Sequence, residues 1–216
     1  MRKLGYEAYS CDILPAGGDH PEWHVCGDAI PLVNGKCDFT TQDGVKHTID
    51  GKWDLLIAHP PCTYLTCASA IRLFNKDGTI KDYNRYKLGT EAAVFFYSFL
   101  YADCDHICVE NPVPLKCFGL PRYDQVIEPY MFGEPWKKRT CLWLRGLPKL
   151  QPTDTVEPKG LWIGSTSGQR DNTIYKRYEY TSKRNQRERS RTFIGIAKAI
   201  AKQFGGYVEA YENNHM

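Results

Sequence analysis

The chain has 216 residues, of which 42% are apolar and 25% are charged. These values are typical of a soluble domain, and they disfavour disordered, collagen-like and fibrous proteins. No apolar run is long enough to span a membrane, and the first residues lack the apolar stretch of a signal peptide. We therefore expect a cytoplasmic protein with one main domain and no membrane partner.

The nine cysteines form an odd number without regular spacing, so we expect mostly reduced thiols. The pairs Cys62/Cys67 and Cys104/Cys108 lack the spacing and the matching second pair of a zinc site, so no metal is predicted. The net charge of +3 is small, and positive charge collects towards the C-terminal part of the chain.

The first half of the chain contains patterns of strand, helix and strand. Residues 7–14 alternate and stop at a turn rich in proline and glycine, which predicts a strand. Residues 53–58 are nearly all apolar and are followed by two prolines, as in a strand buried on both faces. Residues 84–101 have helical spacing, and the apolar residues 106–109 predict another strand.

The second half contains two further patterns. Residues 125–132 and 139–144 predict a closing pair of strands, and residues 192–204 have the periodicity of a C-terminal helix. Alternating strands and helices predict an α/β sheet that binds its ligands at the carboxyl ends of the strands. Asp12, Cys62 and Glu110 each close or follow an expected strand, so we expect the three to converge on one crevice.

Cys62 and Glu110 are the residues best suited to chemistry. A thiolate can add to C6 of a cytosine while a neutral carboxylic acid protonates N3, and this addition activates the otherwise unreactive C5. Taken singly, Cys62 is more typical of a buried thiol and Glu110 of a solvated carboxylate. A Pro-Pro-Cys after one buried strand and a Glu-Asn-Pro after the next favour a functional pair.

These motifs resemble those of the cytosine-C5 DNA methyltransferases, especially small phage and prophage members, along nearly the whole chain. Pro61-Cys62-Thr63-Tyr64-Leu65-Thr66 is similar to the Pro-Cys-Gln-x-Phe-Ser nucleophile loop of the family. Glu110-Asn111-Pro112 is similar to its Glu-Asn-Val. The stretch 132–140 resembles the family's aromatic-Gly-x-Pro-Gln-x-Arg-x-Arg segment, with Lys138 at the first arginine position and Arg139 one position out of register.

The resemblance implies a Rossmann-like class I methyltransferase sheet with helices on both faces and S-adenosylmethionine as cofactor. Asp12 corresponds to the acid that binds the ribose hydroxyls, Ile13 packs against the adenine, and Asp28 reads its amino group. In full, the implied catalytic residues are Cys62, Glu110, Asn111, Lys138 and Arg139, and the implied cofactor residues are Asp12, Ile13, Asp28, Pro60 and Thr192.

Double-stranded DNA is the expected partner. Residues 168–191 hold eight Lys/Arg against three acids, interleaved with tyrosines, which suits phosphate contact and base stacking. A charge run is more often a solvated face, and the DNA interpretation rests on the base-modifying motifs that precede it. The residues expected to contact DNA are Arg170, Lys176, Arg177, Lys183, Arg184 and Arg187.

We expect a catalytic core over 1–145, a short basic target-recognition insert over 146–186 and a C-terminal helix over 187–216 that packs back on the core. The family's opening strand and its Phe-x-Gly-x-Gly turn have no counterpart before Asp12, so the fold is predicted to be truncated at its N-terminus. Because that strand lies in the middle of the sheet, its absence would leave two neighbouring strands without a partner.

Three explanations of that absence stay open: a missed upstream start, a separate polypeptide that supplies the strand, or a degenerate relative with weak or no activity. Two other functions also stay open. His59-Pro60-Pro61-Cys62 is similar to the tetrapeptide of the amino methyltransferases that act on adenine N6 or cytosine N4, although its first and last residues differ. A DNA-binding relative without catalysis would keep the fold and the basic segment.

Overall fold

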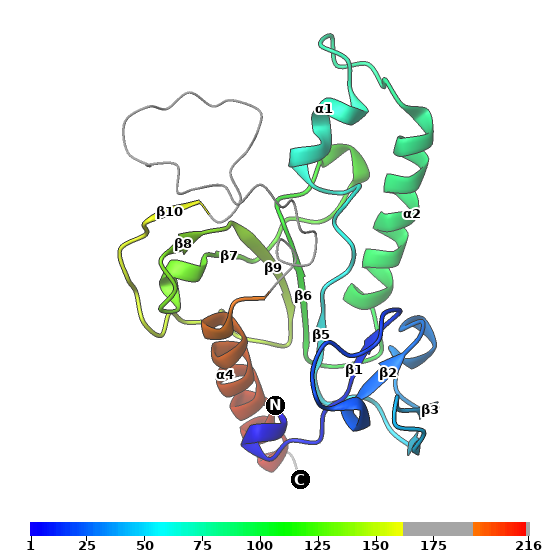
Figure 1. Ribbon diagram of the computed structural model, residues 1–216, viewed down its shortest axis with the longest axis vertical. Coiled ribbons are helices and arrows are strands. Elements are labelled where there is room, and N and C mark those ends of the chain that lie inside the picture. Colours follow the sequence, from blue (N-terminus) through cyan, green and yellow to red (C-terminus); the bar gives the residue numbers. More distant parts are fainter. Residues whose placement is uncertain (162–191, 215–216) are drawn as a thin grey trace.

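A four-stranded mixed sheet, in the order β5–β6–β9–β7, forms the centre of the protein. This computed structural model describes residues 1–161 and 192–214 and has a mixed α/β fold (Figure 1). Strand β5 (Leu56–Ala58) runs parallel to β6 (Ile107–Asn111). Strand β9 (Thr140–Arg145) runs antiparallel to β6 and to β7 (Gln125–Ile127). The closing pair of strands predicted from the sequence is therefore confirmed.

Side chains that alternate along β6 enter two different cores, which makes this strand the hub of the fold. Ile107 and Val109 are fully buried in one core together with Phe96. Cys108, equally buried, enters the second core together with Phe204. This arrangement explains why residues 107–109 of the expected strand are all apolar: both faces of the strand are covered.

Two long helices provide these covers, one on each face of the sheet (Figure 1). Helix α2 (Tyr83–Leu100) begins where the Asp82 carboxylate accepts a hydrogen bond from the backbone N–H of Arg85 over 2.8 Å, a typical N-cap. Helix α4 (Ile194–Asn213) packs on the other face through residues such as Ile196 and Phe204. Both helices confirm the sequence predictions, and α4 continues nine residues beyond the predicted end at residue 204.

Smaller elements complete the described part of the chain. Strands β1 (Ser10–Asp12) and β2 (His24–Cys26) form a parallel pair. Strands β3 (Cys37–Thr40) and β4 (Lys46–Ile49) form an antiparallel hairpin that the sequence patterns did not predict. Helix α1 (Ala70–Leu73) follows β5 in the chain, and β8 (Trp136–Lys137) and β10 (Gly160–Leu161) form a short parallel pair.

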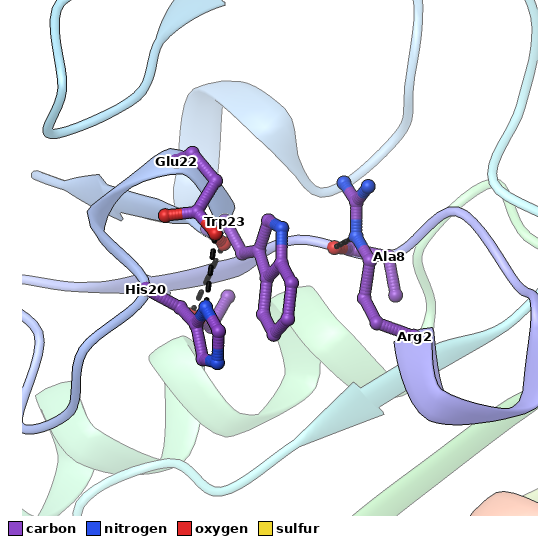
Figure 2. A network of polar contacts seen from close by, with 6 residues as sticks. Arg2, Ala8, His20, Glu22 and Trp23 are labelled. Carbon is purple, nitrogen blue, oxygen red and sulfur yellow. Dashed lines mark hydrogen bonds and ion pairs between the residues drawn. The ribbon is translucent and has the colours of Figure 1, made fainter.

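The first residues are fastened to the β1–β2 pair by an aromatic stack (Figure 2). The Trp23 ring stacks on His20 at 3.7 Å, and the Arg2 guanidinium lies 5.5 Å from the Trp23 ring centroid. Arg2 also donates from Nε to the carbonyl oxygen of Ala8 over 2.8 Å. Arg2 belongs to a three-residue 3-10 helix, Arg2–Leu4.

The β1–β2 pair and the central sheet are separate sheets. Among the described residues, β1 pairs only with β2, and β5, at the edge of the central sheet, pairs only with β6. Within the same residues, no helix has both the length and the apolar character needed to cross a membrane.

Candidate functional site

The loop that carries Cys62 leaves β5 and is held by the end of β6. Pro60 is buried, and its carbonyl oxygen accepts a hydrogen bond from Nδ2 of Asn111 over 2.8 Å. The backbone N–H groups of Leu65 and Thr66 both donate to the carbonyl oxygen of Cys62, over 3.1 Å each. The half-buried cysteine therefore sits at the start of a tight turn rather than on an open loop.

A second set of contacts ties this loop to the segment after Glu110. The backbone N–H of Leu115 donates to the Leu65 carbonyl over 2.6 Å, and that of Cys67 donates to the Val113 carbonyl over 2.9 Å. From helix α2, Arg85 donates from Nη2 to the carbonyl oxygen of Thr63 over 2.8 Å. The same guanidinium lies 4.9 Å from the centre of the Tyr64 ring. The two loops thus form one bonded unit.

Glu110 is presented to the cleft from inside strand β6. The pairing of Ala58 with Val109 puts the next residues of the two parallel strands side by side, and Nδ1 of His59 lies 2.9 Å from Oε2 of Glu110. The Glu110 side chain is 24% exposed and that of His59 is 44% exposed. The sequence motifs did not single out His59 as a site residue, because only the register of the sheet brings it to Glu110.

Lys138 is the cation that interacts with both Glu110 and Cys62. Burial lowers the pKa of its ammonium, while the charges of Glu110 and Cys62 act in the opposite direction. Its Nζ also lies 5.6 Å from the centre of the Phe193 ring at the start of α4. One lysine therefore interacts electrostatically with both residues that the sequence paired.

Arg139 points elsewhere. Its side chain is exposed, and its charge acts on Glu128, whose pKa is raised by burial and lowered by Lys137 and Arg139. The sequence motifs do not decide which of the two cations approaches the candidate base site. The structure brings Lys138, the residue at the family's first arginine position, next to Glu110 and Cys62.

A narrow cleft of about 20 Å³ opens beside these residues. Strands β6, β7 and β9 and the start of α4 surround it, and it holds about one water molecule at this volume. Thr192, expected to contact the cofactor, lines this cleft with Glu110 and Lys138. The complete lining consists of His59, Glu110, Ile127, Lys138, Thr140, Leu142, Thr192, Phe193, Ile196 and Ile200.

The residues expected to hold adenosine form a second group at the carboxyl ends of β1 and β2. Asp12 ends β1, and its carbonyl oxygen accepts a hydrogen bond from the N–H of Gly27, which precedes Asp28. Each carboxylate caps its own turn: Asp12 accepts from Leu14 over 2.9 Å, and Asp28 accepts from Ile30 over 3.0 Å. Ile13 is 78% exposed beside them.

This second group offers hydrogen-bond acceptors and an apolar side chain to a nucleoside-like ligand. Two carboxylates can accept hydrogen bonds from ribose hydroxyls and an amino group, and the exposed Ile13 side chain offers an apolar surface to a purine ring. Pro60, also expected at the cofactor, is buried, with its carbonyl bonded to Asn111. The structure therefore brings Asp12, Ile13 and Asp28 together and assigns Pro60 to the support of the Cys62 loop.

The expected DNA contacts Arg170, Lys176, Arg177, Lys183, Arg184 and Arg187 lie outside the described residues. Comparisons with known proteins add no family: no family model matches the chain, and no curated protein or solved structure matches it either.

Proposed function

We propose that this protein is a DNA cytosine-C5 methyltransferase with a Rossmann-like sheet of the class I methyltransferase type. The observation that carries the proposal is the bonded unit of two loops at the ends of the parallel strands β5 and β6. One loop holds the Cys62 thiol and the other follows the Glu110 carboxyl, and Lys138 interacts with both side chains. A carboxyl and a cation that line one cleft, with a thiol on the adjoining loop, suit nucleophilic addition to a ring.

The proposed reaction begins when a cytosine is flipped out of the duplex towards the cleft. A cleft of about 20 Å³ is too small for a base, so the start of α4 or the Cys62 loop has to move aside. The Cys62 thiolate then forms a bond to C6, and N3 takes a proton from the Glu110 carboxyl. The Lys138 ammonium interacts with the charge of the Cys62 sulfur.

S-adenosylmethionine, when bound, supplies the methyl group that C5 receives. Asp12 and Asp28 would hold its ribose and adenine, and Ile13 would cover one ring face. After C5 has gained the methyl group, loss of the C5 proton to a base expels the Cys62 sulfur from C6, and Glu110 takes back the proton from N3. The thiol side chain is thereby restored for another turnover.

The test is covalent trapping on duplex DNA that contains 5-fluorocytosine, in the presence of S-adenosylmethionine. The C5 fluorine cannot leave as a proton does, so the enzyme stays attached to C6. We expect a denaturation-resistant adduct with the native chain and none with Cys62→Ala. Cys67→Ala is the matched control, because Cys67 is an exposed free thiol five residues further along the same segment.

The outcomes separate the alternatives. An adduct that is lost only in Cys62→Ala supports the proposal, and an adduct that survives this substitution overturns it. Methyl transfer to DNA without any adduct would indicate an amino methyltransferase. DNA binding without S-adenosylmethionine binding, measured by calorimetry, would indicate a relative that has lost catalysis.

A further inference from the structure

Besides Lys138, Glu110 interacts with His59, and both His59 and Glu110 are titratable groups at the edge of the cleft. His59 is the first residue after β5, and its Nδ1 is 2.9 Å from Oε2 of Glu110. With 44% of its side chain exposed, the imidazole reaches solvent and also contacts the carboxyl, which is 24% exposed. His59 and Glu110 line the same cleft.

Three other groups interact with the Glu110 charge. The Lys138 ammonium is one of them, and it lines the same cleft. Cys108 and Cys141 are the others, but burial raises the pKa of these thiols to about 12 and about 11, so neither gives up a proton near neutral pH. Of these groups, His59 combines a direct contact with the Glu110 carboxyl with an exposed ring, which can take a proton at one nitrogen and give one at the other.

We propose that His59 is a proton relay that returns Glu110 to its acid form in each turnover. The inference rests on the proposed function. As the sulfur–C6 bond forms, the proton on one carboxyl oxygen of Glu110 passes to N3. At the same time the N–H bond at Nδ1 of the neutral imidazole breaks, that proton passes to Oε2, and Nε2 takes a proton from solvent. When N3 is deprotonated, its proton returns to Glu110, the Oε2 proton returns to Nδ1, and Nε2 releases a proton to solvent.

The decisive experiment is chemical rescue of His59→Ala. General acid–base groups contribute about 10²–10⁴-fold to a rate, so we expect single-turnover methyl transfer to fall by about a hundredfold or more at this variant, with little change in the KM for DNA. Added imidazole should restore part of the rate, and its effect should grow with the imidazole concentration. A merely structural histidine would not be replaced by a small molecule in solution.

The chain contains a matched control. Nδ1 of His20 lies 2.9 Å from Oε1 of Glu22, the same separation as in the His59–Glu110 pair, but in the stack that fastens the first residues. His20→Ala should keep the native rate and its pH profile. A His59→Ala rate within a factor of about three of the native rate, or a loss that imidazole does not reverse, overturns the relay.

A measurement without turnover separates this inference from the proposed function. Long-range proton–nitrogen NMR correlations report which ring nitrogen of His59 carries hydrogen. The relay requires hydrogen on Nδ1 in the native protein and loss of that preference in Glu110→Ala. Hydrogen on Nε2 alone refutes the relay even if methyl transfer is robust, whereas a native chain without transfer or adduct refutes the proposed function.

Discussion

Asn111 donates a hydrogen bond from Nδ2 to the carbonyl oxygen of Pro60 over 2.8 Å, and this bond joins the two loops that carry Glu110 and Cys62. Asn111 is 1% exposed, and its Oδ1 has no hydrogen-bond partner among the residues that the structure describes. The side chain is therefore held in the core by one bond, at the cost of an unsatisfied acceptor. Such a cost suits a residue whose task is to hold the site.

Asn111→Asp should destabilise the protein and abolish trapping. The substitution keeps the shape but replaces the donor by an acceptor, so two oxygens face each other in a buried place. We expect the free energy of unfolding to fall by about 2 kcal/mol or more, measured by urea denaturation. Asn214→Asp is the control, because Asn214 makes the same 2.8 Å bond, to Ala210, at the exposed end of α4. Equal losses in the two variants would contradict the supporting role.

Much of this fold could be predicted from local patterns. The apolar runs at β5 and β6 and the helical spacing of α2 and α4 depend only on which faces are buried. The β3–β4 hairpin was missed because its strands alternate weakly, although Asp43-Gly44 is a recognised turn signal and Gly44 has a φ of 90°. Strand β2, with three residues, is too short to give a periodic pattern.

In the candidate site too, some residues could be predicted from local sequence patterns and others could not. Cys62 and Glu110 could be found because each belongs to a motif next to an apolar run. His59 could not, because its contact with Glu110 depends on the register between β5 and β6, which no local pattern contains. The choice between Lys138 and Arg139 likewise depends on which side chain turns towards the cleft. Register and side-chain direction are properties of the assembled sheet.

Lys138→Met should lower the activity of the protein but raise its stability. We expect a loss of about a hundredfold in kcat, the usual cost of removing one preorganised electrostatic partner, as judged by single-turnover methyl transfer. Lys137→Met, one residue earlier in β8, is the control and should stay near the native rate. Similar activity in the native chain and in Lys138→Met would remove Lys138 from the site.

The stability effect follows from the sign of the Lys138 shift. Burial lowers the pKa of the folded-state ammonium below its ordinary value of 10.5, so the unfolded chain binds more protons between the two values. Native stability attributable to this group therefore rises with pH through that window. Lys138→Met should raise the free energy of unfolding at pH 7, and the difference should shrink as the pH approaches 10.5. Urea denaturation at several pH values measures it, and a difference that grows with pH would refute the assignment.

Buried thiols should resist alkylation in the native protein. Burial raises the pKa of Cys108 to about 12 and that of Cys141 to about 11, and both side chains are fully buried. At pH 8 we expect iodoacetamide to modify the exposed Cys26, Cys67 and Cys117 first. Cys108 and Cys141 should react only after unfolding in urea, as read by mass spectrometry of the peptides. Early modification of Cys108 would mean that α4 does not stay packed on the sheet.

Gly195 sets how closely α4 approaches the segment before Lys138. A Cβ at this position would lie 1.9 Å from the carbonyl oxygen of Phe132, a backbone atom, and the Gly195 N–H donates to Glu134 over 2.9 Å. Gly195→Ala must therefore push the start of α4 away from the cleft, at a cost of about 1–3 kcal/mol in the free energy of unfolding.

Gly206→Ala, in the same helix, separates the effect of the clash with Phe132 from the general gain in helix propensity that alanine brings. No atom lies within 4 Å of a Cβ added at Gly206, so alanine should stabilise the protein by up to about 1 kcal/mol. Thermal unfolding of the two variants should thus move in opposite directions. Because Thr192 and Phe193 line the cleft with Glu110 and Lys138, Gly195→Ala should also reduce trapping on 5-fluorocytosine DNA, whereas Gly206→Ala should not. Parallel behaviour of the two variants would show that the contact with Phe132 does not position α4.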